Sequence, residues 1–362
     1  MDFSGFLVQL LNGLASASSL FLVAVGLSLI FGVTRIVNFA HGSFYMVGAY
    51  VAYTLVSLWS GALGFWVSLL LAALVVAALG ALIEMLLLRR IYKAPELFQL
   101  LATFALVLVI RDASLWLWGP EELLGPRAPG FSGAVEILGR LFPTYDLFLV
   151  AMGPVVLGLL WLLLTRTRWG VLVRAASHDR GMVAALGVNQ VWLFTAVFAL
   201  GAFLAGLGGA FQLPREPANL EMDLHIIGSA FVVVVVGGMG SIPGAYVAAL
   251  LISEIKAICI WLGVVDIGGF VVSFSKFTLV VEFLVMALVL VLRPWGLFGR
   301  PQPLSRHTGH SEEPMRLGKG NQSLIWGLVV FFFLLALPLY SAQSPYTIIL
   351  AIDLLVAALF AT

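Results

Sequence analysis

The stretch GLSLIFGVTRIVNFAHGSFYMVGAY, residues 26–50, sets a group of polar side chains between two long apolar runs. These runs cover residues 6–31 and 39–59, and each has about the 20 residues that a helix needs to cross a bilayer. Arg35, Asn38, His41 and Gly42 lie between or at the edge of them. Because polar groups are costly in hydrocarbon, they must face protein, water or the membrane interface. The stretch therefore predicts two membrane helices joined by a polar turn.

The rest of the chain repeats this apolar pattern. Its 362 residues are 62% hydrophobic and 10% charged, whereas soluble domains carry about 25% charged residues. Lipid offers no hydrogen-bond partner to an exposed backbone, so helices are the expected spanning structure. We therefore expect an all-α, polytopic integral membrane bundle with broken or re-entrant helices. Further apolar runs cover residues 62–88, 97–117, 143–164, 190–212, 224–236, 243–262, 277–292, 324–340 and 346–362.

Basic residues gather in a few connections between these runs. By the positive-inside bias, those connections belong at the cytoplasmic face, which puts the N-terminus outside and predicts nine crossings up to Arg293. The count holds if 224–262 crosses twice; since its first half is short, a broken or re-entrant pair of half-helices is the alternative. The basic connections contain Arg35; Arg89, Arg90 and Lys93; Arg166, Arg168, Arg174 and Arg180; and Arg293, Arg300, Arg306, Arg316 and Lys319.

Residues for enzymatic chemistry are missing from the sequence. The five histidines show no HExxH spacing, and neither a GxxxxGK[ST] phosphate loop nor a GxSxG nucleophile elbow occurs. Cys259 is the only cysteine, so no intramolecular disulfide can form. We expect no catalytic residue, cofactor or metal, and no nucleic-acid partner. Any energy from ATP would have to come from a separate protein.

A second informative stretch, RAASHDRGMVAALGVN at 174–189, predicts a short amphipathic helix on the cytoplasmic face. Ser177 is a candidate N-cap and Gly187 a candidate helix end. Met182, Val183 and Leu186 fall on one side at helical spacing. This helix either rests on lipid headgroups or docks through its apolar side into a groove of a cytoplasmic partner.

Three groups of residues are candidates for the translocation path or its gate, each with a structural alternative. Asn38, His41 and Gly42 can instead form a turn at the cytoplasmic boundary, with Asn38 capping the next helix. The segment VVVVVGGMGSIPG at 232–244 can serve packing or a hinge. The charged residues within apolar runs can form pairs between helices, and Glu84 is near enough to a span end to reach the interface. Besides the first group, the path candidates are Gly237, Gly238, Gly240, Glu254, Lys256 and Glu282. Glu254 and Lys256 are two residues apart on a helix and should not face each other. The path would be lined from residues 32–46 and 232–256.

These stretches together resemble the H-type permease of branched-chain amino-acid ABC importers. The resemblance covers about residues 1–300 and rests on the segments 26–50, 174–189 and 232–252, followed by LRPWGLFG at 292–299. It implies a second permease of the M type, two cytoplasmic ATPase subunits, a periplasmic substrate-binding protein and a place in the bacterial cytoplasmic (inner) membrane. It also implies that 175–187 is the coupling helix that contacts the ATPase, with candidate residues Ala176, Ser177, Met182, Val183, Leu186 and Gly187.

The resemblance predicts a permease transmembrane domain at 1–299, followed by a polar linker at 300–323 rich in Pro, Gly and charged residues. Residues 324–362 resemble the start of the M-type permease, which suggests an H–M fusion cut short at Thr362. The expected function is the permease subunit of an ATP-driven importer for branched-chain or related amino acids, with amides or urea as other possible substrates. The alternative is a secondary transporter or channel, in which Glu254 and Glu282 would couple ions or protons.

Overall fold

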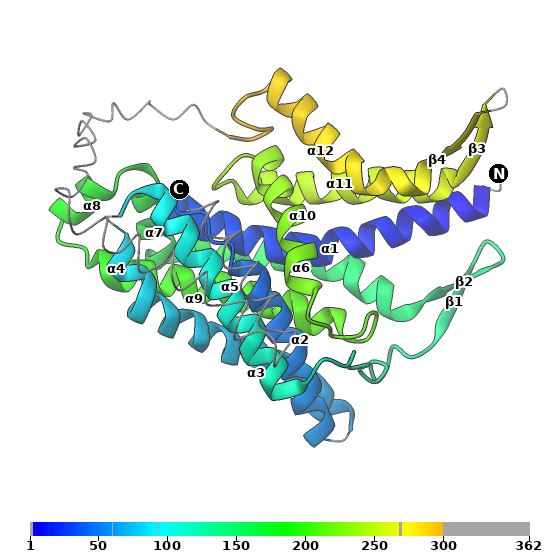
Figure 1. Cartoon of the computed structure of the whole chain (residues 1–362), viewed down its shortest axis with the longest axis horizontal. Coiled ribbons are helices and arrows are strands. Elements are labelled where there is room, and N and C mark those ends of the chain that lie inside the picture. The colour runs from blue at the N-terminus through cyan, green and yellow to red at the C-terminus, as the bar shows by residue number, and fades with distance from the viewer. Residues whose placement is uncertain (1–2, 60, 93, 268–269, 300–362) are drawn as a thin grey trace, which may run out of the picture. The chain divides into compact units, whose positions relative to one another are not determined.

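The computed structural model describes residues 3–59, 61–92, 94–267 and 270–299, and this part of the chain is mostly helical (Figure 1). Seven of its helices are long and apolar enough to cross a membrane, which confirms the predicted polytopic bundle. They are α1 (Phe3–Thr34), the continuous helix of α3 (Ala62–Ile83), η1 (Glu84–Leu88) and α4 (Arg89–Ile91), then α5 (Glu96–Trp118), α6 (Thr144–Arg166), α9 (Gln190–Gln212), α11 (Ile242–Leu262) and α12 (Phe274–Leu292).

Two shorter helices occupy the remaining apolar runs before residue 300. These are α2 (His41–Leu58) and α10 (Met222–Gly237), and α10 falls short of the length of a full span. The 16 residues of α10 cover roughly 24 Å at 1.5 Å per residue, less than the hydrocarbon thickness. The linker predicted at 300–323 and the second unit predicted at 324–362 lie outside the described residues.

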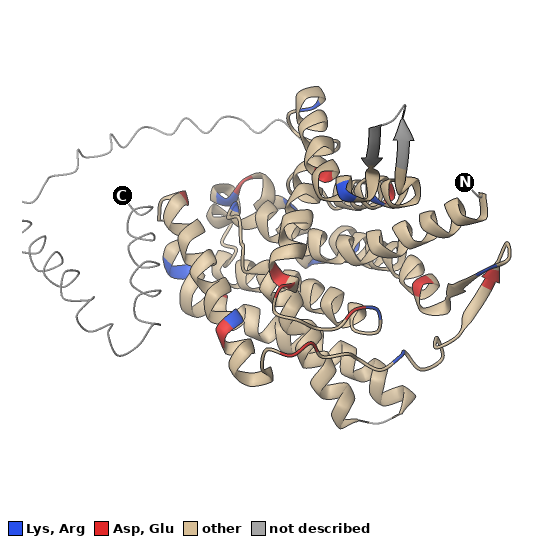
Figure 2. Ribbon diagram, turned by 45° about the vertical axis from the view of Figure 1, so that its right-hand side comes forward, with Lys and Arg blue, Asp and Glu red and all other residues tan. Residues whose placement is uncertain are grey.

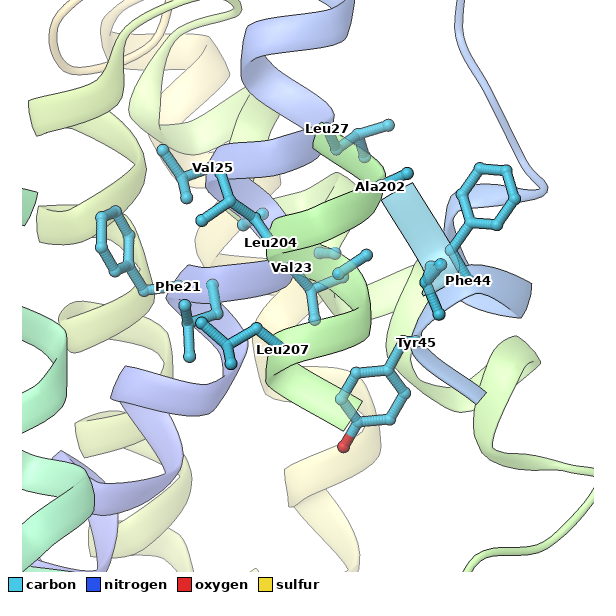
Figure 3. Close-up of a cluster of buried hydrophobic side chains, with 14 of the residues drawn as sticks. Phe21, Val23, Val25, Leu27, Phe44, Tyr45, Ala202, Leu204 and Leu207 are labelled. Carbon is cyan, nitrogen blue, oxygen red and sulfur yellow. The ribbon is translucent and has the colours of Figure 1, made fainter. Parts of the chain in front are cut away.

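Helix α1 lies at the centre of the bundle, packed against α2, α6, α9, α10 and α11. Small residues let its backbone approach its neighbours closely, as is usual between membrane helices. A Cβ atom on Gly26 would lie only 2.6 Å from the carbonyl oxygen of Gly201 in α9. Figure 3 shows this core, in which α1 contributes Phe21, Val23, Val25 and Leu27, α2 contributes Phe44 and Tyr45, and α9 contributes Ala202, Leu204 and Leu207.

The two ends of the bundle carry different connections. At one end, the antiparallel hairpin of β1 (Ala134–Ile137) and β2 (Arg140–Pro143) meets the start of α1, where Arg140 Nε donates to Ser4 Oγ at 3.3 Å. A second antiparallel hairpin, β3 (Val264–Ile267) and β4 (Phe270–Ser273), joins α11 to α12 at the same end (Figure 1). Charged residues are sparse along the helices (Figure 2).

The basic connections meet at the opposite end. There α7 (Arg168–His178) and α8 (Arg180–Ala185) follow α6, and Arg35 just after α1 donates from Nη2 to the Ser177 carbonyl at 3.0 Å. Arg89 of α4, at the end of the continuous helix that begins with α3, donates to Thr195 Oγ1 near the start of α9 at 2.8 Å. Three of the predicted basic connections, far apart in the sequence, therefore meet at one basic end, while Arg300, Arg306, Arg316 and Lys319 lie outside the described residues.

Candidate functional site

The polar turn after α1 does not stay at the boundary of the bundle. Residues 35–40 run back along α1, and His41 Nε2 lies 3.0 Å from the carbonyl oxygen of Val23. Val23 precedes the end of α1 at Thr34 by 11 residues, which is roughly 16 Å along a helix. Helix α2 therefore begins deep inside the bundle. The expectation of a turn at the cytoplasmic boundary is wrong, because the chain re-enters before the helix starts.

Asn38, His41 and Gly42 are packed into the interior at this re-entrant turn. Asn38 Oδ1 accepts from the backbone N–H of Ala40 at 3.1 Å, which closes a turn ahead of α2 but does not cap the helix. His41 is fully buried. A Cβ atom on Gly42 would lie 2.9 Å from Cβ of Ile227 in α10. The three residues set where α2 starts and how closely α10 approaches it.

A cavity of about 390 Å³, lined by both polar and apolar side chains, opens in the half of the bundle nearest the two hairpins. Its α1 wall runs from Gln9 to Leu20, close to the end of α1 that meets the β1–β2 hairpin. The polar side chains of this wall repeat at helical spacing, namely Gln9, Asn12, Ser16 and Ser19. The facing elements contribute Gln212, Arg215, Asn219, Ser229, Ser253 and Lys256.

Two ion pairs contribute to the cavity wall. In each pair the cation lines the cavity and the carboxylate lies behind it. Arg215 Nε lies 2.9 Å from Asp146 Oδ1 of α6, and Lys256 Nζ lies 2.5 Å from Glu282 Oε2 of α12. Ser229 of α10 joins the second pair, donating to Glu282 at 2.8 Å and accepting from Lys256 at 3.2 Å. The predicted path candidate Glu282 therefore supports the cavity from behind, in an interhelical pair.

Glu254 lies outside the cavity lining, in the seam between α1 and α11. Its Oε1 atom is 2.9 Å from the position that a Cβ atom on Gly13 would take, and Gly13 lines the cavity from the other side. Neither carboxylate oxygen has a hydrogen-bond partner within the described part of the chain. Glu254 and Lys256 point to different sides of α11, as their spacing of two residues predicted.

The glycines between α10 and α11 form a tight turn between the two helices and do not line the cavity. Gly238 and Gly240 have φ values of +98° and +86°, which favour glycine, and Gly240 N–H donates to Ser28 Oγ of α1 at 3.2 Å. The segment after α12 docks here, where Leu297 N–H donates to the carbonyl of Val236 at 2.8 Å. Gly237, Gly238 and Gly240 thus lie at a packed junction and do not border the cavity.

Most of the cavity wall lies outside the segments that the sequence indicated for the path. Of the segments 32–46 and 232–256, only Tyr45, Ser253 and Lys256 line the cavity. The available signal was the run of Gln9, Asn12, Ser16 and Ser19 on one face of an otherwise apolar helix.

The amphipathic segment at the basic end is two short helices instead of one. Helix α7 continues to His178, and Asp179 Oδ1 caps α8 by accepting from the backbone N–H of Met182 at 3.0 Å. The expectation that Ser177 is the N-cap is wrong, since its hydroxyl lies in the last turn of α7 and donates to the Arg174 carbonyl. Gly187 ends the segment at φ +82°, as expected.

The apolar residues of this segment divide between the bundle and the surface. Ala176 and Val183 are buried, whereas the side chains of Met182 and Leu186 are exposed, at 60% and 76% respectively. Gln190 at the start of α9 donates to the Arg180 carbonyl, and the Arg180 guanidinium lies 5.6 Å from the centre of the Phe194 ring. Helix α8 therefore presents two apolar side chains while its other side is held against α9.

A buried carboxylate joins the helices beneath α8. Glu84 is fully buried in the π-helical turn η1, which contradicts the expectation that it reaches the interface. Its oxygens accept from Arg89 Nη2 at 3.1 Å, the Tyr92 hydroxyl at 2.9 Å and Thr195 Oγ1 at 2.6 Å. Burial and the charge of Glu84 raise the pKa of Tyr92, so its hydroxyl remains a donor. We call Glu84, Arg89, Tyr92 and Thr195 the Glu84 cluster.

Comparison with known proteins identifies the family. Residues 9–292 match the model of the branched-chain amino acid transport system / permease component family. The chain belongs to this family of membrane permeases. Its match extends from the first turns of α1 to the end of α12, and thus includes the cavity, the re-entrant turn and α7–α8.

Individual relatives agree with this assignment. The chain is 29% identical over 308 residues to the high-affinity branched-chain amino acid transport system permease protein BraD of Pseudomonas aeruginosa, covering 82% of this chain and 97% of BraD. It is 26% identical over 314 residues to LivH of Salmonella typhimurium, at 83% and 98% coverage. It is also 26% identical over 304 residues to LivM of the same organism, at 78% and 68% coverage. No solved structure matches the chain.

Proposed function

We propose that this permease is the membrane subunit of an ATP-driven importer for branched-chain amino acids, with the cavity as its transit chamber. The observation that carries the proposal is the division of one bundle into two functional ends. A cavity that polar side chains help to line lies in the half nearest the hairpins. The exposed apolar side chains of Met182 in α8 and Leu186 just after it lie among arginines at the other end. An ATPase bound at the α8 end could thus act on the cavity at the hairpin end.

Helix α8 is the proposed contact for the ATPase. Exposed Met182 and Leu186 would fill a groove of the ATPase, in the way that amphipathic helices dock into apolar grooves. Helix α8 is tied to α9 through Gln190 and Phe194, and α9 is tied to α3 through the Glu84 cluster. Because packed helices move as units, a pull on α8 would reach α9 and α3, which pack on each other and around α1 and α2.

The same proposal assigns the partners and the orientation. Two cytoplasmic ATPase subunits would bind the α8 ends of this chain and of an M-type permease, and a periplasmic substrate-binding protein would deliver the amino acid at the hairpin end. Similarity to both LivH and LivM supports a paired arrangement of related permeases. The basic end would face the cytoplasm of a bacterium, across its inner membrane. We further propose that residues 300–323 are a linker and that 324–362 begin an M-type unit.

Uptake by the complete complex in lipid vesicles tests this function. The complex of this chain, its partner permease, the two ATPase subunits and the binding protein should accumulate L-leucine only when ATP is supplied on the α8 side. The double variant M182E/L186E should insert normally but lose most uptake, because charged side chains would replace the apolar contact. The matched control M182L/L186M keeps the contact apolar and should retain uptake. Uptake that needs no ATP, or that M182E/L186E leaves unchanged, would contradict the proposal.

A further inference from the structure

The cations of the two ion pairs line the cavity, whereas their carboxylate partners do not. Lys256 and Arg215 line the wall, and their side chains are 28% and 19% exposed. Their acidic partners, Glu282 and Asp146, do not line it, and their side chains are 9% and 10% exposed. Among the described lining residues Glu216 is the only acid, and it is exposed to solvent. A molecule inside the cavity therefore meets cationic donors, with the balancing carboxylates behind them.

Lys256 has one donor to spare for such a molecule. A lysine ammonium group has three N–H donors, and within the described residues Glu282 and Ser229 accept two of them. Glu282 of α12 approaches from behind the wall, whereas Ser229 of α10 lines the cavity beside Lys256. The ammonium group is thereby fixed in position without being enclosed.

We infer that Lys256, positioned by Glu282 and Ser229, binds the carboxylate of the transported molecule as it passes through the cavity. This inference rests on the proposed transport function and narrows its substrate class to small carboxylates such as amino acids. Neutral substrates such as urea and simple amides lack the anionic group that a cation at the wall would select. The negative charge of Glu282 weakens the attraction of Lys256 for an anion. Weak binding suits transport, because a transported molecule must be able to leave the site.

Cysteine modification in the assembled complex tests the charge of the wall directly. Ser16 lines the cavity and is exposed, so S16C can report the local potential through its reaction rates with anionic sulfonatoethyl and cationic trimethylammonioethyl methanethiosulfonate. In K256M the ratio of anionic to cationic rates should fall several-fold, because the loss of one positive charge at the wall slows the anionic reagent and speeds the cationic one. In E282Q the ratio should rise. The matched control K276M removes an exposed lysine of α12 outside the cavity lining and should leave the ratio unchanged.

Protection against modification tests the recognition itself. L-valine, isovalerate and isovaleramide share one branched skeleton, but only the first two carry a carboxylate. Both carboxylates should slow modification of S16C at millimolar concentration and isovaleramide should not, and K256M should abolish the difference while K256R retains it. Equal protection by isovaleramide, or protection that survives in K256M, would overturn the inference.

The inference and the transport proposal fail in different ways. If Lys256 only joins helices, the two carboxylates will protect S16C no better than isovaleramide does, while ATP-dependent uptake by the complex with Lys256 intact persists. Absence of ATP-dependent uptake in that complex would instead refute the proposed function. A K256M complex that keeps ATP hydrolysis stimulated by the binding protein, but takes up leucine several-fold more slowly, would support carboxylate binding over a folding defect.

Discussion

Replacing Glu84 should destabilise this permease more than replacing any exposed acid at the same end. In E84A the partly buried Tyr92 hydroxyl loses its acceptor, which costs about 1–3 kcal/mol. The ion pair with Arg89 adds only about 1 kcal/mol, because the Arg89 side chain is 35% exposed and screened by water. Thr195 loses little, since its one hydroxyl proton can be donated to the Val191 carbonyl, 2.9 Å away, instead.

The void left by the fully buried side chain adds a further contribution, so the total for E84A is about 3–5 kcal/mol. E84Q keeps the shape and an acceptor for Tyr92 and should cost about 1–2 kcal/mol. Thermal unfolding of the purified permease in lipid nanodiscs measures both. At roughly 2–3 °C per kcal/mol, the midpoint should fall by about 6–15 °C for E84A and about 2–6 °C for E84Q.

Glu96 provides the matched control, because it is an exposed acid at the start of α5 on the same side of the bundle. E96Q should change the stability by no more than about 0.5 kcal/mol. Equal midpoints for E84A and E96Q would refute the assignment of Glu84 as the joint beneath α8. If the joint also transmits the motion of α8, E84A should lower the leucine taken up per ATP hydrolysed, measured at a temperature where the variant is folded.

Two further predictions concern the local structure. D179A should destabilise α8 by about 1 kcal/mol, because the helix loses its N-cap, and the amides of residues 180–186 should exchange hydrogen faster. S177A should leave the exchange of these amides unchanged. The reverse result would show that Ser177 is the cap. G26L should keep α1 and α9 apart, so that size-exclusion chromatography no longer shows a folded complex. G158A should leave the complex intact, because a Cβ atom there meets nothing within 4 Å. A normal G26L complex would contradict the close crossing of α1 and α9.

The helices were predictable because each apolar run carries its own signal. A run of about 20 apolar residues meets the requirement for spanning whatever surrounds it, so all nine runs before residue 300 are helices. The short run at 224–236 likewise predicted the short α10. The two hairpins next to the helix ends are brief four-residue strands that left no comparable signal in the sequence.

The site was harder to predict because it depends on depth and on distant partners. The re-entrant turn follows from where His41 meets Val23, 18 residues earlier, and no local pattern fixes that contact. Glu84 was expected to reach the interface, but its acceptor role involves Thr195, 111 residues away. Lys256 and Glu282 could be recognised as candidates for pairing, yet only the packing of α11 and α12 shows which of them borders the cavity.

The sidedness of the two ends tests the account most directly. In intact spheroplasts and in inside-out vesicles of cells expressing the complex, a membrane-impermeant maleimide should label L186C only from the cytoplasmic side and S16C only from the outside when ATP is absent. Labelling of L186C from the outside would contradict the proposed arrangement, because a cytoplasmic ATPase could not then reach α8.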